Sequence, residues 1–176
     1  MNTVLIRPSR DDDLPAVTAI YADAVLTGTA SFEIEPPSEG VMAERRRALL
    51  AGGYPYLVAQ GRDRVLGYAY AGPYRPRPAY RWSVEDSVYV AREGQGQGVG
   101  RALLAGLIEA SEAAGFRLMV AVIGDADAQA SIGLHRALGF REAGVFEGIG
   151  FKHGRWLSSV LMQRPLGEGT ASPPAG

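Results

Sequence analysis

Glycine recurs at alternate positions in the stretch REGQGQGVGR. Gly94, Gly96, Gly98 and Gly100 follow an expected strand and precede a run with helical periodicity. Glycine loses more backbone entropy on folding than any other residue, so this run needs a compensating gain. The first turn of a helix presents unpaired N–H groups and the positive end of the helix dipole, and glycine lets an anion approach them closely. The run predicts a phosphate site, with a flexible or tight turn as the alternative.

Two familiar phosphate-binding motifs do not match this run. A P-loop ends in Gly-Lys-Ser/Thr, whereas Arg101 and Ala102 follow Gly100. A dinucleotide-binding fold has its glycines after the first strand, whereas here they come past the middle of the chain. Neither motif therefore explains the glycine run.

Composition limits the classes of function that remain. The 176 residues are 47% hydrophobic, which suits one compact domain, and 18 basic against 19 acidic residues give a net charge of −1. We therefore expect no nucleic-acid partner and no membrane partner. Cysteine is absent, which excludes disulfides and a cysteine nucleophile, and with only His135 and His153 as imidazoles we expect no metal site.

The ends of the chain give further expectations. The N-terminus lacks a basic segment followed by an apolar one, and the apolar run LMVAVIG at 118–124 is too short to cross a bilayer. We expect a cytoplasmic protein. A single domain over 1–166 is predicted, followed by a disordered tail over 167–176, which is rich in small residues, proline and glycine.

Hydrophobic periodicity indicates the elements that position the glycine run. Helices are expected after the acidic residues 11–13, from a Ser38 cap to Gly52, after the glycine run to Gly115, and over 129–138. Strands are expected at 3–7, 54–60, 65–74, 80–90, 116–124, 144–151 and 155–163. Helices alternate with hairpins, which predicts an α/β fold of the α+β type with a mixed sheet.

Alternation within 80–90 separates two kinds of side chain. One face carries Trp82, Val84, Val88 and Val90, and the other carries Glu85, Ser87 and Tyr89, unless a bulge shifts the register.

Gln95, Gly98 and Gly100 match the acetyl-CoA signature Gln/Arg-x-x-Gly-x-Gly/Ala of the GNAT N-acetyltransferases. The segments TASFEIEPP, VLGYAYAGPYRPRPAYRWSVEDSVYV, ASIGLHRALGF and GFKHGRWL extend this similarity, and the chain resembles the phosphinothricin and methionine sulfoximine N-acetyltransferase branch. The resemblance implies the GNAT fold, with a mostly antiparallel sheet of about seven strands, splayed between strands 4 and 5, and about four helices.

The resemblance implies acetyl-CoA as cosubstrate. Its pantetheine would lie in the splay like an added strand, and the Val90 N–H would polarise the thioester carbonyl. Relatives carry asparagine where this chain has Ala128, so either the loop GDADAQ is rearranged or Gln129 or Ser131 substitutes for the asparagine. The implied cofactor-binding residues are Val88, Tyr89, Val90, Gln95, Gly96, Gln97, Gly98, Val99, Gly100, Arg101 and Ser131.

Two residues receive catalytic roles from the resemblance. Glu85 in VEDSVYV is the implied general base, which would take a proton from the attacking amine; the alternative is an ordinary solvent-facing glutamate. His135 occupies the position of a tyrosine that protonates the leaving thiolate in many relatives. It is either that general acid or a packed helix residue.

Several residues are implied in substrate binding. Arg75 and Arg77, with Pro76 between them, are expected to bind a carboxylate or phosphinate, because guanidinium groups match such oxygens in pairs; solvated loop charges are the alternative. Phe32 and Glu33 would line the acceptor pocket, although Phe32 also suits a core. Asp86 and Ser87 join Glu85 there, although Asp86 alternatively caps or solvates the strand.

The expected function is transfer of acetyl from acetyl-CoA to the α-amino group of a small amino acid or analogue, such as phosphinothricin, methionine sulfoximine or methionine sulfone. Transfer would be direct, in a ternary complex. The alternatives are a GNAT enzyme for an antibiotic, a polyamine or a protein N-terminus, and a non-catalytic CoA-binding module. A small-molecule amine is the expected partner, and the resemblance implies a homodimer.

Overall fold

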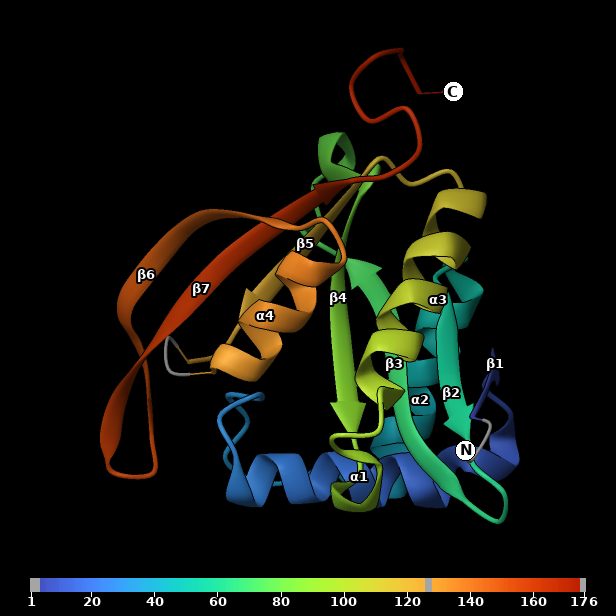
Figure 1. Ribbon diagram of the computed structural model, residues 1–176, viewed down its shortest axis with the longest axis vertical. Coiled ribbons are helices and arrows are strands. Elements are labelled where there is room, and N and C mark those ends of the chain that lie inside the picture. Colours follow the sequence, from blue (N-terminus) through green and yellow to red (C-terminus); the bar gives the residue numbers. More distant parts are fainter. Residues whose placement is uncertain (1–3, 126–127, 175–176) are drawn as a thin grey trace.

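The computed structural model describes residues 4–125 and 128–174. Over these residues the chain forms one seven-stranded sheet in the order β1-β2-β3-β4-β5-β7-β6 (Figure 1). Among the strands of the described residues, only β4 and β5 pair in parallel. The strands are β1 (Leu5–Pro8), β2 (Tyr56–Gln60), β3 (Val65–Pro73), β4 (Ser83–Val90), β5 (Leu118–Ile123), β6 (Arg141–Lys152) and β7 (Arg155–Pro165).

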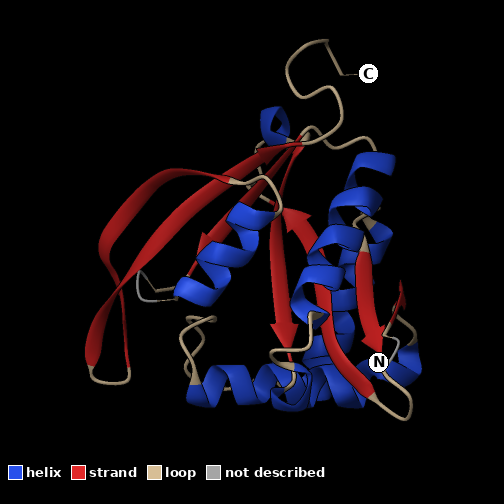
Figure 2. Ribbon diagram, viewed as in Figure 1, coloured by secondary structure: helices blue, strands red, loops and turns tan. Residues whose placement is uncertain are grey.

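Four α-helices in the described ranges cover the two faces of the sheet (Figure 2). They are α1 (Leu14–Thr27), α2 (Glu39–Ala51), α3 (Val99–Ala113) and α4 (Gln129–Ala137). Buried leucines of α3 form one core with β2–β5 and α4, whereas α1 and α2 enclose a second core with the tyrosines of β2 and β3. The predicted fold class, a mixed and mostly antiparallel GNAT-type sheet, is confirmed.

Local signals in the sequence explain where the elements begin and end. The Ser38 hydroxyl accepts a hydrogen bond from the Val41 N–H and caps α2 as predicted. The Gly61 N–H donates to the Arg64 carbonyl and closes the β2–β3 hairpin. None of the helices in the described ranges is long and apolar enough to cross a membrane.

The sheet opens between β4 and β5. The described residues pair only as Ser83–Leu118, Val84–Met119 and Glu85–Val120, and the two strands then diverge (Figure 1). The predicted splay is therefore confirmed. The Trp82 carbonyl accepts hydrogen bonds from the β5 side, whereas the Ala91 N–H donates to the Leu66 carbonyl on the β3 side. Backbone groups alternate in direction along a strand, so those of the even-numbered β4 residues face the opening.

Side chains of β4 alternate as the sequence predicts, without a bulge. Val84, Val88 and Val90 belong to the core under α3 and α4. Tyr89 packs in the core under α1 and α2, on the face that Glu85 and Ser87 share. Side chains of adjacent β4 residues therefore pack on opposite faces of the sheet.

The loop after α1 is fixed against the β6–β7 hairpin. The buried Lys152 ammonium donates to the Ser31 carbonyl over 2.6 Å. Phe32 lies against Gly124 and Gly150, and a Cβ at Gly124 would come within 2.9 Å of its ring. His153, at the hairpin turn, lies 3.1 Å from the Gly28 carbonyl. These contacts hold Phe32 at a junction of segments.

The chain continues beyond β7 as turns. Leu166 is fully buried, and Arg117 donates to the carbonyls of Gly169 and Pro173 and to the Ser172 hydroxyl. Residues 175–176 lie outside the described residues, and disorder of 167–176 stays a prediction.

Gly67 marks a close approach between β3, β4 and α3. A Cβ there would lie 2.8 Å from the Tyr89 carbonyl oxygen and 3.0 Å from Leu103 Cδ1. We predict that Gly67→Ala lowers the free energy of unfolding in urea by about 1–3 kcal/mol, because backbone and core must shift. The matched control is Gly133→Ala in α4, where a Cβ meets nothing within 4 Å. It should raise that free energy by about 0.5–1 kcal/mol. Equal stability of the two variants would contradict the packing argument.

Candidate active site

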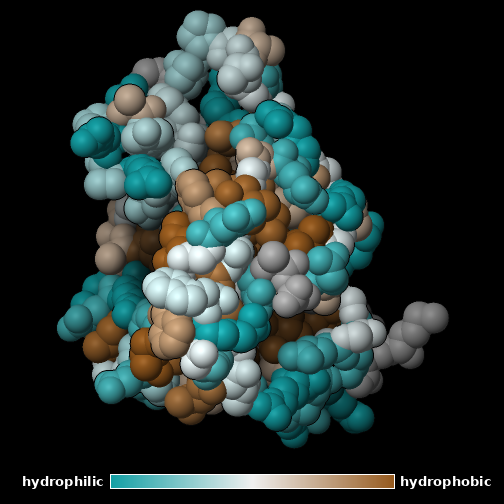
Figure 3. All heavy atoms as spheres, turned by 90° about the vertical axis from the view of Figure 1, so that its left-hand side faces the viewer, coloured by the Kyte–Doolittle hydropathy of each residue, from teal (hydrophilic) through white to brown (hydrophobic). Residues whose placement is uncertain are grey.

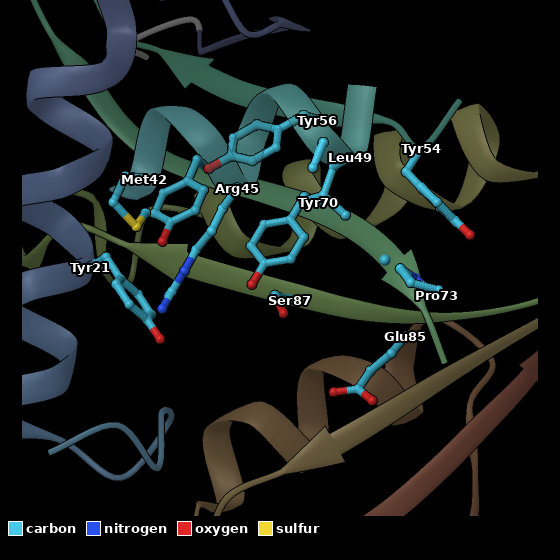
Figure 4. Close-up of a pocket in the computed structure, with 13 residues that line it drawn as sticks. Tyr21, Met42, Arg45, Leu49, Tyr54, Tyr56, Tyr70, Pro73, Glu85 and Ser87 are labelled. Atoms are coloured by element: carbon cyan, nitrogen blue, oxygen red, sulfur yellow. The ribbon is translucent and has the colours of Figure 1, made fainter. Parts of the chain in front are cut away.

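A cavity of about 490 Å³ lies between β4 and the helices α1 and α2 (Figure 4). We call it the tyrosine cavity. Its lining residues are Tyr21, Met42, Arg45, Ala48, Leu49, Tyr54, Tyr56, Tyr68, Tyr70, Gly72, Pro73, Glu85 and Ser87. Its size falls within the range of small-molecule sites.

Glu85 is a partly buried carboxylate at one end of this cavity. Burial raises the pKa of the Glu85 carboxyl, the negative charge of Asp86 raises it further, and Arg75 partly offsets the increase. A carboxylate with a raised pKa in a cleft suits proton abstraction from an amine. The arrangement supports the base role over that of a solvated strand residue.

Tyrosine rings form the wall of the cavity. Tyr56 stacks on Tyr68 at 5.8 Å and on Tyr70 at 5.2 Å, and Tyr68 stacks on Tyr89 at 5.3 Å between ring centroids. Burial raises the pKa of each of these four hydroxyls, so at neutral pH they remain protonated and can donate hydrogen bonds.

Arg45 brings a positive charge into the cavity from α2. Its two terminal nitrogens lie 2.6 and 3.4 Å from the carboxylate oxygens of Glu33. The Tyr21 hydroxyl donates to the same carboxylate over 2.9 Å. Glu33, which the sequence predicts as a pocket residue, therefore acts on the cavity by positioning these two lining residues.

Asp86 points away from Glu85 and contacts His135 on the opposite side of the sheet. His135 Nδ1 lies 2.8 Å from the Ser131 carbonyl, which can only accept, so this nitrogen carries a proton. Nε2 lies 3.0 Å from Asp86 Oδ2, and both side chains are buried. Burial lowers the pKa of His135, but the hydrogen bond and charge of Asp86 and the Ser131 carbonyl outweigh it, and the net direction is upward.

The glycine run forms the start of α3, and its members have different surroundings. Gly96 and Gly98 have φ values of 71° and 79°, which favour glycine, and a Cβ at either would meet no described protein atom within 4 Å. Gly94 is buried, and a Cβ there would lie 2.9 Å from the Leu66 carbonyl oxygen, so this glycine serves packing. The exposed side of the loop at Gly96 and Gly98 is accessible to an anion.

The opening in the sheet leads to this loop. Val88 and Val90, being even-numbered, turn backbone groups toward the opening, whereas those of Tyr89 face β3. An extended amide chain can pair with such an edge as an additional strand would. The unpaired edge and the glycine loop together fit a ligand that carries amides followed by a diphosphate.

Other predicted residues lie around the cavity without lining it. Arg75, Pro76 and Arg77 are exposed in the loop before β4, where the charge of Arg75 acts on Glu85. Phe32 packs at the junction with β6.

Sequence reasoning missed Arg45 and the tyrosines. The alternation of tyrosine with alanine in YAYA is a signal that could have indicated the wall, since it places Tyr68 and Tyr70 on one face of a strand.

A protein-family model described as "Acetyltransferase (GNAT) domain" matches residues 6–161. The chain is 54% identical to a phosphinothricin N-acetyltransferase of Alcaligenes faecalis, over 96% of this chain and 86% of that protein. It is 43% identical to an L-methionine sulfoximine/L-methionine sulfone acetyltransferase of Pseudomonas paraeruginosa, over 96% and 98%.

Solved structures show the same relationship. The crystal structure of a GNAT superfamily phosphinothricin acetyltransferase from Sinorhizobium meliloti, in complex with AcCoA, superposes with a TM-score of 0.95. The two sequences are 51% identical, and the match covers 98% of this chain and 94% of the Sinorhizobium meliloti chain. The open sheet, the glycine loop and these similarities lead to one conclusion: the chain belongs to the GNAT family of acetyltransferases.

Proposed function

We propose that the protein transfers the acetyl group of acetyl-CoA to the α-amino group of a small amino acid or analogue, of the kind named in its phosphinothricin and methionine sulfoximine relatives. The observation that carries this proposal is Glu85, a carboxylate of raised pKa that lies between a small-molecule cavity and the opening of the sheet. Acetyl-CoA supplies an activated thioester to this site.

Glu85 acts as the general base. An α-amine is largely protonated near neutral pH, and only its neutral form attacks a thioester. Glu85 accepts the proton directly or through a water molecule, and direct attack in a ternary complex requires no acyl-enzyme. The Val90 N–H at the open edge donates to the thioester oxygen, which becomes negative during attack.

The glycine loop binds the diphosphate through backbone N–H groups and the helix dipole. Gln95, Gln97, Val99 and Arg101 flank these groups. The lining residue Ser87 and the arginines at 75 and 77 orient the acceptor.

His135 has two candidate roles. Both ring nitrogens are engaged, by the Ser131 carbonyl and by Asp86, which favours positioning of α4 against β4. The His135–Asp86 pair nevertheless holds two protons, one on Nδ1 and one shared between Nε2 and the carboxylate. Separation of His135 from Asp86 would make the second proton available to the leaving thiolate. The acid role stays a prediction, as does cytoplasmic location.

The protein forms a homodimer through the β6–β7 hairpin. β6 is an edge strand, and Val145, Phe146, Ile149, Phe151 and Trp156 are exposed on the hairpin. Figure 3 looks at this side, where hydrophobic residues gather over much of the surface. Exposed apolar edges of this kind are typical of interaction sites.

The function is tested with a panel of amines, by thiol release from acetyl-CoA. We expect turnover with phosphinothricin, methionine sulfone or methionine sulfoximine. Glu85→Gln should lower kcat by about 100-fold or more while acetyl-CoA binding, measured by calorimetry, is retained. No turnover on any amine would favour the CoA-binding module, and unchanged kcat would exclude Glu85 as the base.

The raised pKa of Glu85 has a second consequence. In the wild type, kcat should fall as pH decreases through a pKa higher than that of an ordinary glutamate. The pH profile of Glu85→Gln should lack this decrease. A raised carboxyl pKa contributes stability that is fully present below the unfolded-state pKa and is lost as pH rises through the folded-state pKa. The stability of the Gln variant relative to wild type should therefore increase from acid to neutral pH.

The glycine loop gives an ordered series of substitutions. Gly96→Ala and Gly98→Ala should each lower the free energy of unfolding by about 1 kcal/mol, because both need positive φ. At Gly100 a Cβ meets only ordinary contacts, 3.5 Å from Leu134 and Val90, so that variant should be stable. The KM for acetyl-CoA should rise more for Gly98→Ala and Gly100→Ala than for Gly96→Ala. The reverse order would contradict the diphosphate assignment.

The dimer is tested by sedimentation. The wild type should have twice the chain mass of 18.7 kDa, and Ile149→Arg should yield monomers because it buries a charge in the contact. Leu50→Arg, at another exposed leucine, is the control and should remain dimeric. A monomeric wild type would refute the proposal.

A further inference from the structure

The Tyr68 hydroxyl is a buried polar group that lacks a hydrogen-bond partner among the described residues. The side chain is 0% exposed and belongs to the wall of the tyrosine cavity. Buried hydroxyls normally have a hydrogen-bond partner, because a buried hydroxyl without one lowers the stability of the folded state. A buried donor without a partner, in a residue that lines a cavity, is explained if a ligand in that cavity accepts a hydrogen bond from it.

Arg45 supplies further donors in the same cavity. A guanidinium has five N–H groups, and Glu33 engages the two terminal nitrogens from one side. Figure 4 shows the Arg45 side chain extending among Tyr21, Tyr70 and Ser87. Glu33 fixes this direction, since the Tyr21 hydroxyl also holds its carboxylate.

The two ends of the tyrosine cavity differ in charge. In Figure 4, Glu85 lies at one end, and Arg45 lies toward the other end with Tyr56 and Met42. The Glu85 end suits an amine. The Arg45 end offers a cation and protonated tyrosine hydroxyls, because burial raises the pKa of Tyr56 and Tyr68.

We propose that the Arg45 end of the tyrosine cavity binds the side-chain terminus of the acceptor, with Arg45 and the Tyr68 hydroxyl donating to its oxygens. This inference rests on the proposed function and assigns two residues to recognition of the acceptor's side chain. The acceptors named for that function, phosphinothricin, methionine sulfone and methionine sulfoximine, carry oxygen-rich groups at this terminus. A cationic terminus, as in lysine or a polyamine, is disfavoured by repulsion from Arg45.

The apolar lining agrees with this orientation. Met42, Leu49 and Ala48 contribute aliphatic surface between the polar groups, where the methylene groups of such a side chain can pack. Recognition then combines an apolar channel with donors at one end and a carboxylate at the other, which is the usual composition of a small-molecule site.

The first test compares methionine sulfone with methionine, which lacks the sulfone oxygens. Arg45→Met should raise the KM for methionine sulfone about 10- to 100-fold, the loss expected for a charged hydrogen bond, and change that for methionine less than about threefold. Arg45→Lys should retain part of the preference. Arg47→Met, at an exposed arginine of the same helix, is the matched control and should change neither value.

Outcomes of this test separate the two proposals. If wild type acetylates neither amino acid nor phosphinothricin, the proposed function fails. If wild type is active and Arg45→Met changes the KM of methionine sulfone and of methionine equally, the inference fails while the function stands.

Tyr68→Phe provides a second test that does not disturb the Glu33 contact. Removal of an unmet hydroxyl should leave the melting temperature equal or higher, yet raise the KM for methionine sulfone at least about threefold. Ser111→Ala, which removes another unpartnered buried hydroxyl in α3, is the control and should leave that KM unchanged. An unchanged KM in Tyr68→Phe would overturn the assignment of this hydroxyl.

Discussion

The early end of β4–β5 pairing is the constraint on which the rest of the structure depends. After Glu85 the two strands separate, so the backbone groups of the even-numbered β4 residues have no strand partner among the described residues. Unpaired backbone groups in a protein interior are costly unless a partner satisfies them. The opening therefore creates a binding edge, and the glycine loop at the end of β4 places helix N–H groups beyond it.

The same strand connects the two faces of the sheet through neighbouring residues. Glu85 faces the tyrosine cavity, whereas Asp86 faces α4 and pairs with His135. Their proximity along the chain has an electrostatic consequence, because the charge of Asp86 adds to the burial that raises the Glu85 pKa. The residue that anchors α4 thus also adjusts the proton affinity of the proposed base.

One ion pair and one hydrogen bond from a lysine organise the cavity without touching its reacting end. Glu33 fixes Arg45 and Tyr21, and Lys152 holds the Ser31 carbonyl two residues earlier. The loop after α1 is thereby attached both to α2 and to the β6–β7 hairpin.

Local patterns in the amino-acid sequence were sufficient to predict the elements, the fold class, the glycine loop and the family. Helix and strand periods are local properties, and the alternation in SVEDSVYV was enough to assign Glu85 and Ser87 to one face. The Gln95, Gly98 and Gly100 spacing identified the loop because its function depends on residues adjacent in the chain.

The three-dimensional packing was needed to show which distant residues share the cavity and how the surroundings of the glycines differ. Arg45 meets Glu33 through the packing of α2 on the loop after α1, and Tyr56 meets Tyr68 and Tyr70 through β2–β3 register. Gly94 is required by a carbonyl of β3, a contact invisible in the run of alternating glycines. The partner of Asp86 likewise comes from α4, 49 positions away. Such contacts depend on how elements pack, and local sequence patterns carry no record of that packing.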